Sequence, residues 1–113
     1  MAKTYKVAVS EEASTNIEQA CLWIAEADPD AALRWYEGVM AALKGLSNLP
    51  LRCPLAPEYR LGLVDQEIRQ LLYGRGYWKY RILYMVERDR VLILHVRHGA
   101  RLYLGQEQED EES

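Results

Sequence analysis

The sequence predicts a single α+β domain in which a helical hairpin packs on one face of a mainly antiparallel sheet. Along the chain, one short β-rich segment precedes two stretches of helical periodicity and three strand-like segments, giving the order β-α-α-β-β-β. Half of the residues are hydrophobic and 27% are charged, which is ordinary globular composition. With 113 residues, the chain can bury about two thirds of its unfolded surface in one core.

The first half of the chain predicts a strand and two helices. Residues 5–9 are β-rich, and Ser10 follows as a helix N-cap before two acidic residues. The helix expected over about 11–27 carries one apolar face: Ala13, Ile17, Ala20, Cys21 and Ile24. Asp28 is expected to cap a second helix, with Pro29 at the first helical position. This helix is expected to run to about Asn48. Its stripe is Tyr36, Val39, Met40, Leu43 and Leu46, so the hairpin needs a sheet to cover it.

The second half predicts three strands after a proline-punctuated loop at 49–63. The strands are expected over 67–73, 77–86 and 91–97, with turns at 74–76 and 87–90. Because side chains alternate along a strand, the middle strand divides into two faces. We expect Trp78, Tyr80, Ile82, Tyr84 and Val86 on the core face, and Lys79, Arg81, Leu83 and Met85 on the other.

The face that the helices do not cover is predicted to be open and cationic. On the last strand, alternation places Leu92, Leu94 and Val96 in the core and Val91, Ile93, His95 and Arg97 outward, with His98 and Arg101 just beyond. Arg69 is expected to share the open face with Arg81. The alternative is that Arg69 and Arg81 are half-buried ion-pair partners of Glu67 or Asp65, and that His95 is a polar residue on a solvated face.

The net charge of -3 averages two unlike regions. Residues 107–113 hold five of the 17 acidic residues, whereas residues 52–101 hold ten Lys or Arg and five Asp or Glu. This basic half either attracts an anionic partner or serves solubility alone. We therefore expect one domain over 1–105 and a disordered acidic tail over 106–113.

Several classes of protein are disfavoured by the sequence. No apolar run approaches the roughly 20 residues of a membrane span, and no signal peptide is recognisable, so we expect a cytoplasmic protein. Cys21 and Cys53 are expected to be unpaired thiols. Two histidines and two distant cysteines do not form a metal-ligand pattern, and phosphate-binding, nucleophile-elbow and dinucleotide motifs are missing, so neither metal nor cofactor is expected.

Three segments resemble toxins of the RelE/ParE superfamily of bacterial toxin-antitoxin systems. They are "GYWKYRILYMVERDRVLILHVRHGAR" at 76–101, "VSEEASTNIEQACLWIAEADPDAA" near the start and "LPLRCPLAPE" between them. The resemblance covers nearly the whole chain and implies the β-α-α-β-β-β fold. It also implies a cytoplasmic, growth-inhibitory toxin, neutralised by an antitoxin whose C-terminal segment wraps around it. Such a pair autoregulates its operon, touching operator DNA only through the antitoxin, and can stabilise a plasmid.

The superfamily contains two activities. RelE-like members cut messenger RNA on the ribosome, which requires a proton acceptor, a proton donor and cations around the phosphate. In that case Arg81 matches the strand arginine of the family, Arg101 matches the basic residue after the last strand, and Arg69 stands in for another. His98 and Tyr103 would then have to move protons, although neither lies at the family spacing.

ParE-like members inhibit DNA gyrase and lack the nuclease residues. The long hairpin with its "ADPDAA" turn and the "HGAR" ending favour this branch, so we expect a gyrase inhibitor rather than an enzyme. The target contacts would then be Arg69, Lys79, Arg81, Arg97, His98 and Arg101. The alternatives that stay open are the ribosome-dependent endonuclease and an inactive homologue that only binds its antitoxin.

Overall fold

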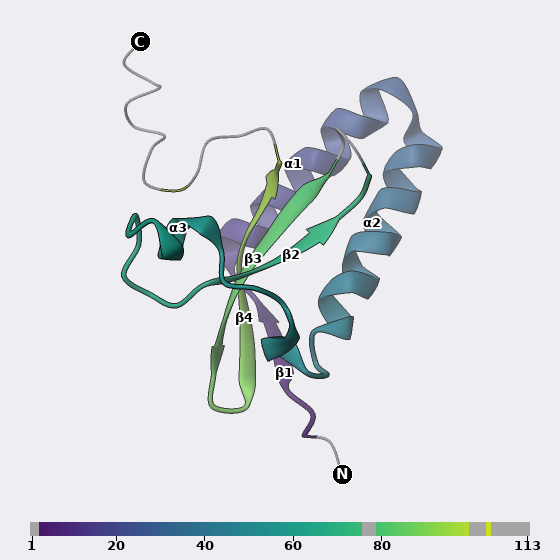
Figure 1. Ribbon diagram of the computed structural model, residues 1–113. Coiled ribbons are helices and arrows are strands. Elements are labelled where there is room, and N and C mark those ends of the chain that lie inside the picture. Colours follow the sequence, from purple (N-terminus) through teal and green to yellow (C-terminus); the bar gives the residue numbers. More distant parts are fainter. Residues whose placement is uncertain (1–2, 76–78, 100–103, 105–113) are drawn as a thin grey trace.

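The computed structural model describes residues 3–75, 79–99 and 104. Among these residues, one sheet forms with the strand order β1-β4-β3-β2 (Figure 1). Its strands are β1 (Lys6–Val9), β2 (Arg69–Tyr73), β3 (Tyr80–Glu87) and β4 (Arg90–His98). The strand β1 is parallel to β4, and the other neighbours are antiparallel, as the predicted fold class requires.

The helical hairpin begins where the capping residues predict. The helix α1 (Glu11–Ala27) starts after Ser10, whose hydroxyl accepts a hydrogen bond from the Ala13 amide at 3.0 Å. The helix α2 (Pro29–Gly45) starts after Asp28, whose carboxylate accepts from the two amides that follow Pro29. The second helix ends three residues before the predicted Asn48, because Asn48 turns away to bridge Thr4 ahead of β1.

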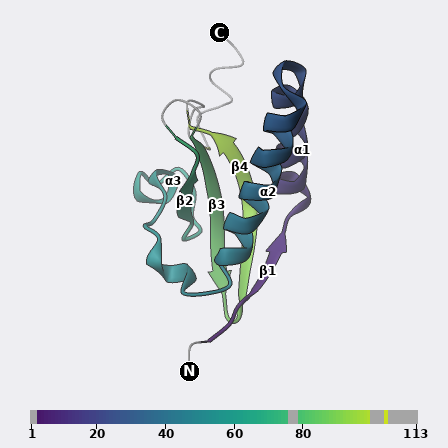
Figure 2. The same cartoon turned by 90° about the vertical axis from the view of Figure 1, so that its right-hand side faces the viewer.

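The main core lies between the hairpin and the sheet, which are packed as two layers (Figure 2). Ala13, Ile17, Val39 and Leu43 are buried on the helices, as their spacing predicts. The sheet contributes Tyr80, Ile82, Tyr84, Val91, Ile93 and Val96. Other members of the predicted stripes lie outside this core, because Tyr36 and Met40 are exposed on the outer side of the hairpin.

A β-bulge reverses part of the facing predicted for β4. Leu83 lies opposite His95 and Tyr84 lies opposite Ile93, so Leu94 is an extra residue without a partner in the register. Val91 and Ile93 are therefore fully buried on the hairpin side, although simple alternation placed them outward. Leu94 instead packs on the second face of the sheet, and only Val96 of the predicted core residues reaches the main core.

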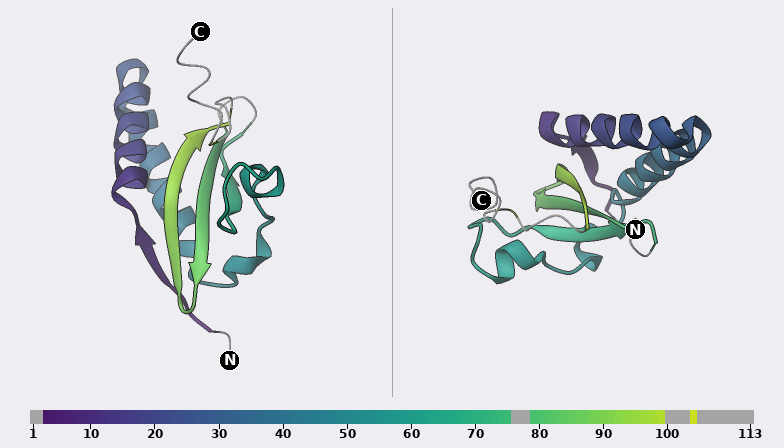
Figure 3. Two further views of the ribbon diagram at one scale, coloured as in Figure 1. Left: turned by 90° about the vertical axis from the view of Figure 1, so that its left-hand side faces the viewer. Right: turned by 90° about the horizontal axis from the view of Figure 1, so that it is seen from above.

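The second face of the sheet is covered where an open face was expected. The segment predicted as a loop contains a 3-10 turn, η1 (Pro50–Arg52), and a short helix, α3 (Pro57–Arg60). Its residue Ala56 forms a small second core with Ile68 and Leu83. Figure 3, in the view from above, shows the segment that carries α3 on the side of the sheet opposite the hairpin.

This segment, residues 49–63, is called the covering segment, and it is bonded to β2 and to Ile68, the residue before β2. The Ala56 amide donates to the Ile68 carbonyl at 2.7 Å, and the Gln70 amide donates to the Pro54 carbonyl at 3.0 Å.

Within the described part of the chain, no helix is long and apolar enough to cross a membrane.

Candidate functional site

The second face of the sheet is centred on a buried ion pair between Arg81 and Glu58. Arg81 lies near the start of the interior strand β3, and its guanidinium donates two hydrogen bonds to the Glu58 carboxylate of α3, one of them at 3.0 Å. Arg81 is 5% exposed and Glu58 is fully buried. A third bond joins Arg81 Nε to the Gln70 side chain at 2.6 Å. The pair therefore fastens α3 to the sheet.

The electrostatic balance keeps Glu58 ionised. Burial alone would raise the pKa of its carboxyl group, because an apolar surrounding disfavours the charge. The hydrogen bonds from Arg81 and from backbone amides, together with the positive charge of Arg81, outweigh that effect and hold the pKa below its usual value. One of these amides belongs to Leu104, which donates to Glu58 at 3.1 Å. Leu104 is thus bonded to the same carboxylate.

Sequence reasoning missed Glu58 as part of this site. The residue lies in a segment predicted as a loop, 23 residues before Arg81, and the expected carboxylates were Asp65 and Glu67. A signal was nevertheless present, since Pro57 is typical of the first position of a helix and Glu58 follows it. A buried arginine on an interior strand is costly without a compensating charge, which the Glu58 carboxylate of this helix supplies.

Arg97 lies directly opposite Arg81 on the neighbouring strand and is also buried. The structure therefore brings these two predicted residues together, on the side of the sheet that the sequence indicates. Both are buried, however, and neither is presented to solvent on an open face. Their burial is the correction that the structure makes to the predicted cationic surface.

Arg69 lies on the opposite face from Arg81, contrary to the prediction that they share one. In the register, Arg69 is opposite Tyr84, whereas Gln70 belongs to the face of Arg81. The Arg69 guanidinium donates to the Cys53 carbonyl at 2.7 Å and lies 3.7 Å from Glu67. The alternative prediction, that Arg69 forms an ion pair with Glu67, is therefore confirmed. Because this ion pair is partly exposed, it contributes little to stability.

His98 also faces away from Arg81. It ends β4 opposite Tyr80, and the two rings meet edge to face with centroids 5.3 Å apart. Tyr80 belongs to the main core, so His98 lies on the hairpin side of the sheet. Lys79 is partly exposed just before β3. Arg101 and Tyr103 lie outside the described residues, and a target-binding role for any of these residues stays a prediction.

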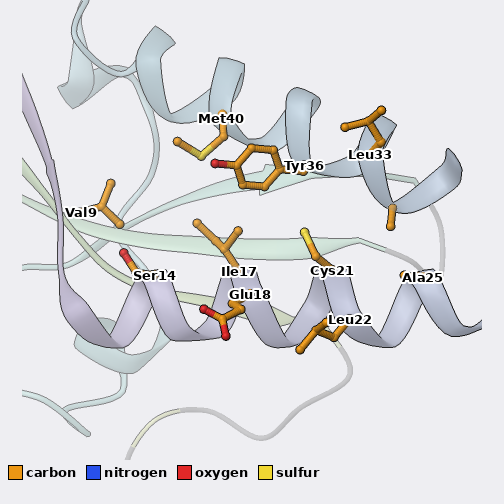
Figure 4. A pocket seen from close by; sticks show the side chains of 11 residues that line it. Val9, Ser14, Ile17, Glu18, Cys21, Leu22, Ala25, Leu33, Tyr36 and Met40 are labelled. Atoms are coloured by element: carbon orange, nitrogen blue, oxygen red, sulfur yellow. The ribbon is translucent and has the colours of Figure 1, made fainter. Parts of the chain in front are cut away.

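A second candidate is an apolar groove on the outer side of the hairpin, which we call the hairpin groove. Its volume is about 600 Å³, and its lining is Val9, Ser14, Ile17, Glu18, Cys21, Leu22, Ala25, Ala32, Leu33, Tyr36 and Met40. Leu22 and Leu33 are 63% and 59% exposed. In Figure 4, side chains of α1 and α2 line the two sides of this groove. Exposed apolar side chains gathered in this way mark an interaction surface.

Comparisons with known proteins agree with this architecture. A family model described as ParE toxin of type II toxin-antitoxin system, parDE, matches residues 7–103, and the chain therefore belongs to this family of the RelE/ParE superfamily. It resembles a solved chain of the chromosomal ParDE TA system from P. aeruginosa with a TM-score of 0.65 and 13% identity. The match covers 84% of this chain and 96% of that chain, and shows a shared fold. No curated protein matches the chain.

Proposed function

We propose that this protein is a growth-inhibitory toxin that acts on DNA gyrase, is neutralised by a cognate antitoxin and serves plasmid stabilisation. Membership of the ParE toxin family supports the toxin role. The observation that favours gyrase over messenger RNA is the burial of Arg81 against Glu58. That arginine occupies the position at which a RelE-like nuclease would place a cation for the phosphate.

A nuclease would have to separate this ion pair before Arg81 could bind a phosphate. Removing one partner of a buried pair costs about 3–5 kcal/mol, because the other charge stays buried without compensation. Moreover, Arg81 and His98 lie on opposite faces of the sheet, so a single phosphate cannot contact both in this arrangement. An inhibitor that works by binding does not need Arg81 and His98 to converge on one phosphate.

The hairpin groove is the surface we propose for the antitoxin. An amphipathic helix binds a groove of this kind by placing its apolar face between the two walls. The exposed leucines Leu22 and Leu33 lie one on each helix and provide those walls. Covering them removes apolar surface from water, at about 25 cal/mol per Å².

The proposed mechanism is tested by removing both charges of the buried pair together. The double substitution Glu58→Met with Arg81→Met replaces the ion pair by apolar side chains of similar length, an exchange that is often neutral for stability. We expect the double variant to fold and to remain toxic when induced in cells. Loss of toxicity in a variant that still melts cooperatively would instead assign Arg81 a direct role.

The proposed antitoxin surface is tested by co-expression with the product of the neighbouring gene. Leu22→Glu and Leu33→Glu should abolish co-purification and leave the cells unprotected. Leu61→Glu is the matched control, because Leu61 is equally exposed, at 62%, but follows α3 on the other side of the sheet. Retained rescue by the groove variants would show that the antitoxin binds elsewhere.

A further inference from the structure

We propose a second docking site, at the end of the sheet where β3 turns into β4, for an acidic protein segment that carries large apolar side chains. The site is a cavity of about 300 Å³, lined by Lys3, Tyr5, Leu49, Leu51 and Arg52. We call it the basic-end groove. It shares no lining residue with the hairpin groove and is independent of the function proposed above.

The basic-end groove lies in a cationic part of the surface. The Lys6 amide donates to the Asp89 carbonyl at 2.9 Å and Lys3 Nζ donates to the Arg88 carbonyl at 3.4 Å, which places the β3–β4 turn beside it. Figure 1 shows this turn and the start of β1 at the same end of the sheet. The exposed bases here are Lys3, Lys6, Arg52, Arg88 and Arg90, against the exposed acids Glu87 and Asp89. The excess of positive charge selects an anionic ligand.

Two exposed leucines give the basic-end groove its apolar character. Leu49 is 66% exposed and Leu51 is 56% exposed. Leu49 also has φ 48° and ψ 53°, a left-handed backbone conformation that is unfavourable for a large side chain. The guanidinium of Arg52 donates to the Asn48 carbonyl at 2.7 Å and to the Leu49 carbonyl at 3.2 Å, which holds the turn. Backbone strain that presents an exposed apolar side chain is characteristic of a functional surface.

The chemistry of the groove favours a protein ligand. Carboxylates would pair with Lys3 and Arg52, and a leucine-sized side chain would pack between Leu49 and Leu51. A single-stranded nucleic acid would instead use aromatic faces for base stacking. The ring of Tyr5 is already engaged, because Lys3 Nζ lies 5.0 Å from its centroid. None of the described residues that line the groove is acidic.

Fluorescence anisotropy with synthetic peptides tests this site. The probe is a fluorescein-labelled peptide of sequence EDELLEDE, with one control in which serines replace both leucines and another in which glutamines replace the acids. We expect each control to bind at least tenfold more weakly, because one loses the apolar contacts and the other the charge. Leu51→Ser and Lys3→Glu should each weaken binding of the probe by about tenfold. Leu61→Ser, outside the groove, should not.

The substitution Leu49→Gly separates a binding role from a structural one. Glycine adopts the left-handed conformation readily, so the thermal midpoint should not fall, whereas binding of the probe should weaken about tenfold. If Leu49 had only a structural role, the thermal midpoint of Leu49→Gly would fall and binding of the probe by the folded protein would not change. The proposal is overturned if Leu49→Gly binds the probe normally, or if the serine control binds equally well. It is also overturned if single-stranded DNA or phosphatidylserine vesicles bind through Leu49 and Leu51 while the probe does not.

Discussion

Replacing Arg81 by alanine would leave the Glu58 carboxylate buried with only part of its hydrogen bonding. The bond from the Leu104 amide survives the substitution, but both bonds from the guanidinium are lost. Removing one partner of a buried ion pair typically costs about 3–5 kcal/mol. Since domains of this size are stable by only about 5–15 kcal/mol, the loss is a large fraction of the total. The thermal midpoint should fall by about 12–25 °C.

Urea denaturation monitored by circular dichroism measures this cost. The free energy of unfolding is compared for the parent chain, Arg81→Ala, Glu58→Ala and the double variant, which together form a double-mutant cycle. Each single substitution should destabilise by about 3–5 kcal/mol, and the double variant by less than the sum. Arg60→Ala is the matched control, because Arg60 is an exposed arginine of α3, the helix that carries Glu58. It should change the free energy of unfolding by less than about 0.5 kcal/mol.

Two results would refute this reasoning. If Arg81→Ala costs less than about 1 kcal/mol, the guanidinium is not the compensating charge for Glu58. If the two single substitutions add without coupling, the residues do not act as a pair. Either result would return Arg81 to the role of an available cation on the sheet and revive the nuclease alternative.

The remaining predictions concern stability. The pKa of Glu58 is lowered in the folded state, so its ionisation stabilises the fold fully above the unfolded value of 4.5, and this stabilisation is lost as the pH falls through the folded value. In Glu58→Gln, the free energy of unfolding measured with urea should therefore fall less steeply as the pH is lowered into this range. Ser10→Ala removes an N-cap and should cost about 1 kcal/mol in the same assay. In Gly38→Ala the added methyl group would collide with the Tyr73 hydroxyl, which donates to the Trp35 carbonyl, and thermal melting should reveal a loss of about 1–3 kcal/mol. An unchanged stability would contradict the Ser10 cap in the first variant and the Tyr73 contact in the second.

The helical hairpin could be predicted closely because its signals are local. Ser10 and Asp28 cap their helices through amides two or three residues away, and the apolar spacing of each helix falls within the same short stretch of chain. These features depend on interactions between near neighbours, which a single sequence displays directly.

The candidate site could be predicted only in part because its geometry depends on distant pairings. The extra residue Leu94 shifts the facing of β4, and no periodic pattern reveals a bulge that is fixed across two strands. The pairing of Arg81 with Glu58 joins a strand to a segment without strong periodicity. Sequence therefore identifies arginines on the second face but does not show that a carboxylate has already neutralised one of them.

DNA supercoiling by purified gyrase tests the central claim most directly. The toxin and its Glu58→Met, Arg81→Met double variant are titrated into the reaction, with a preparation bound to the antitoxin as the control. The proposed function predicts that both free proteins inhibit supercoiling and that the bound preparation does not. Unchanged supercoiling at concentrations of the free, folded toxin that stop growth would contradict it.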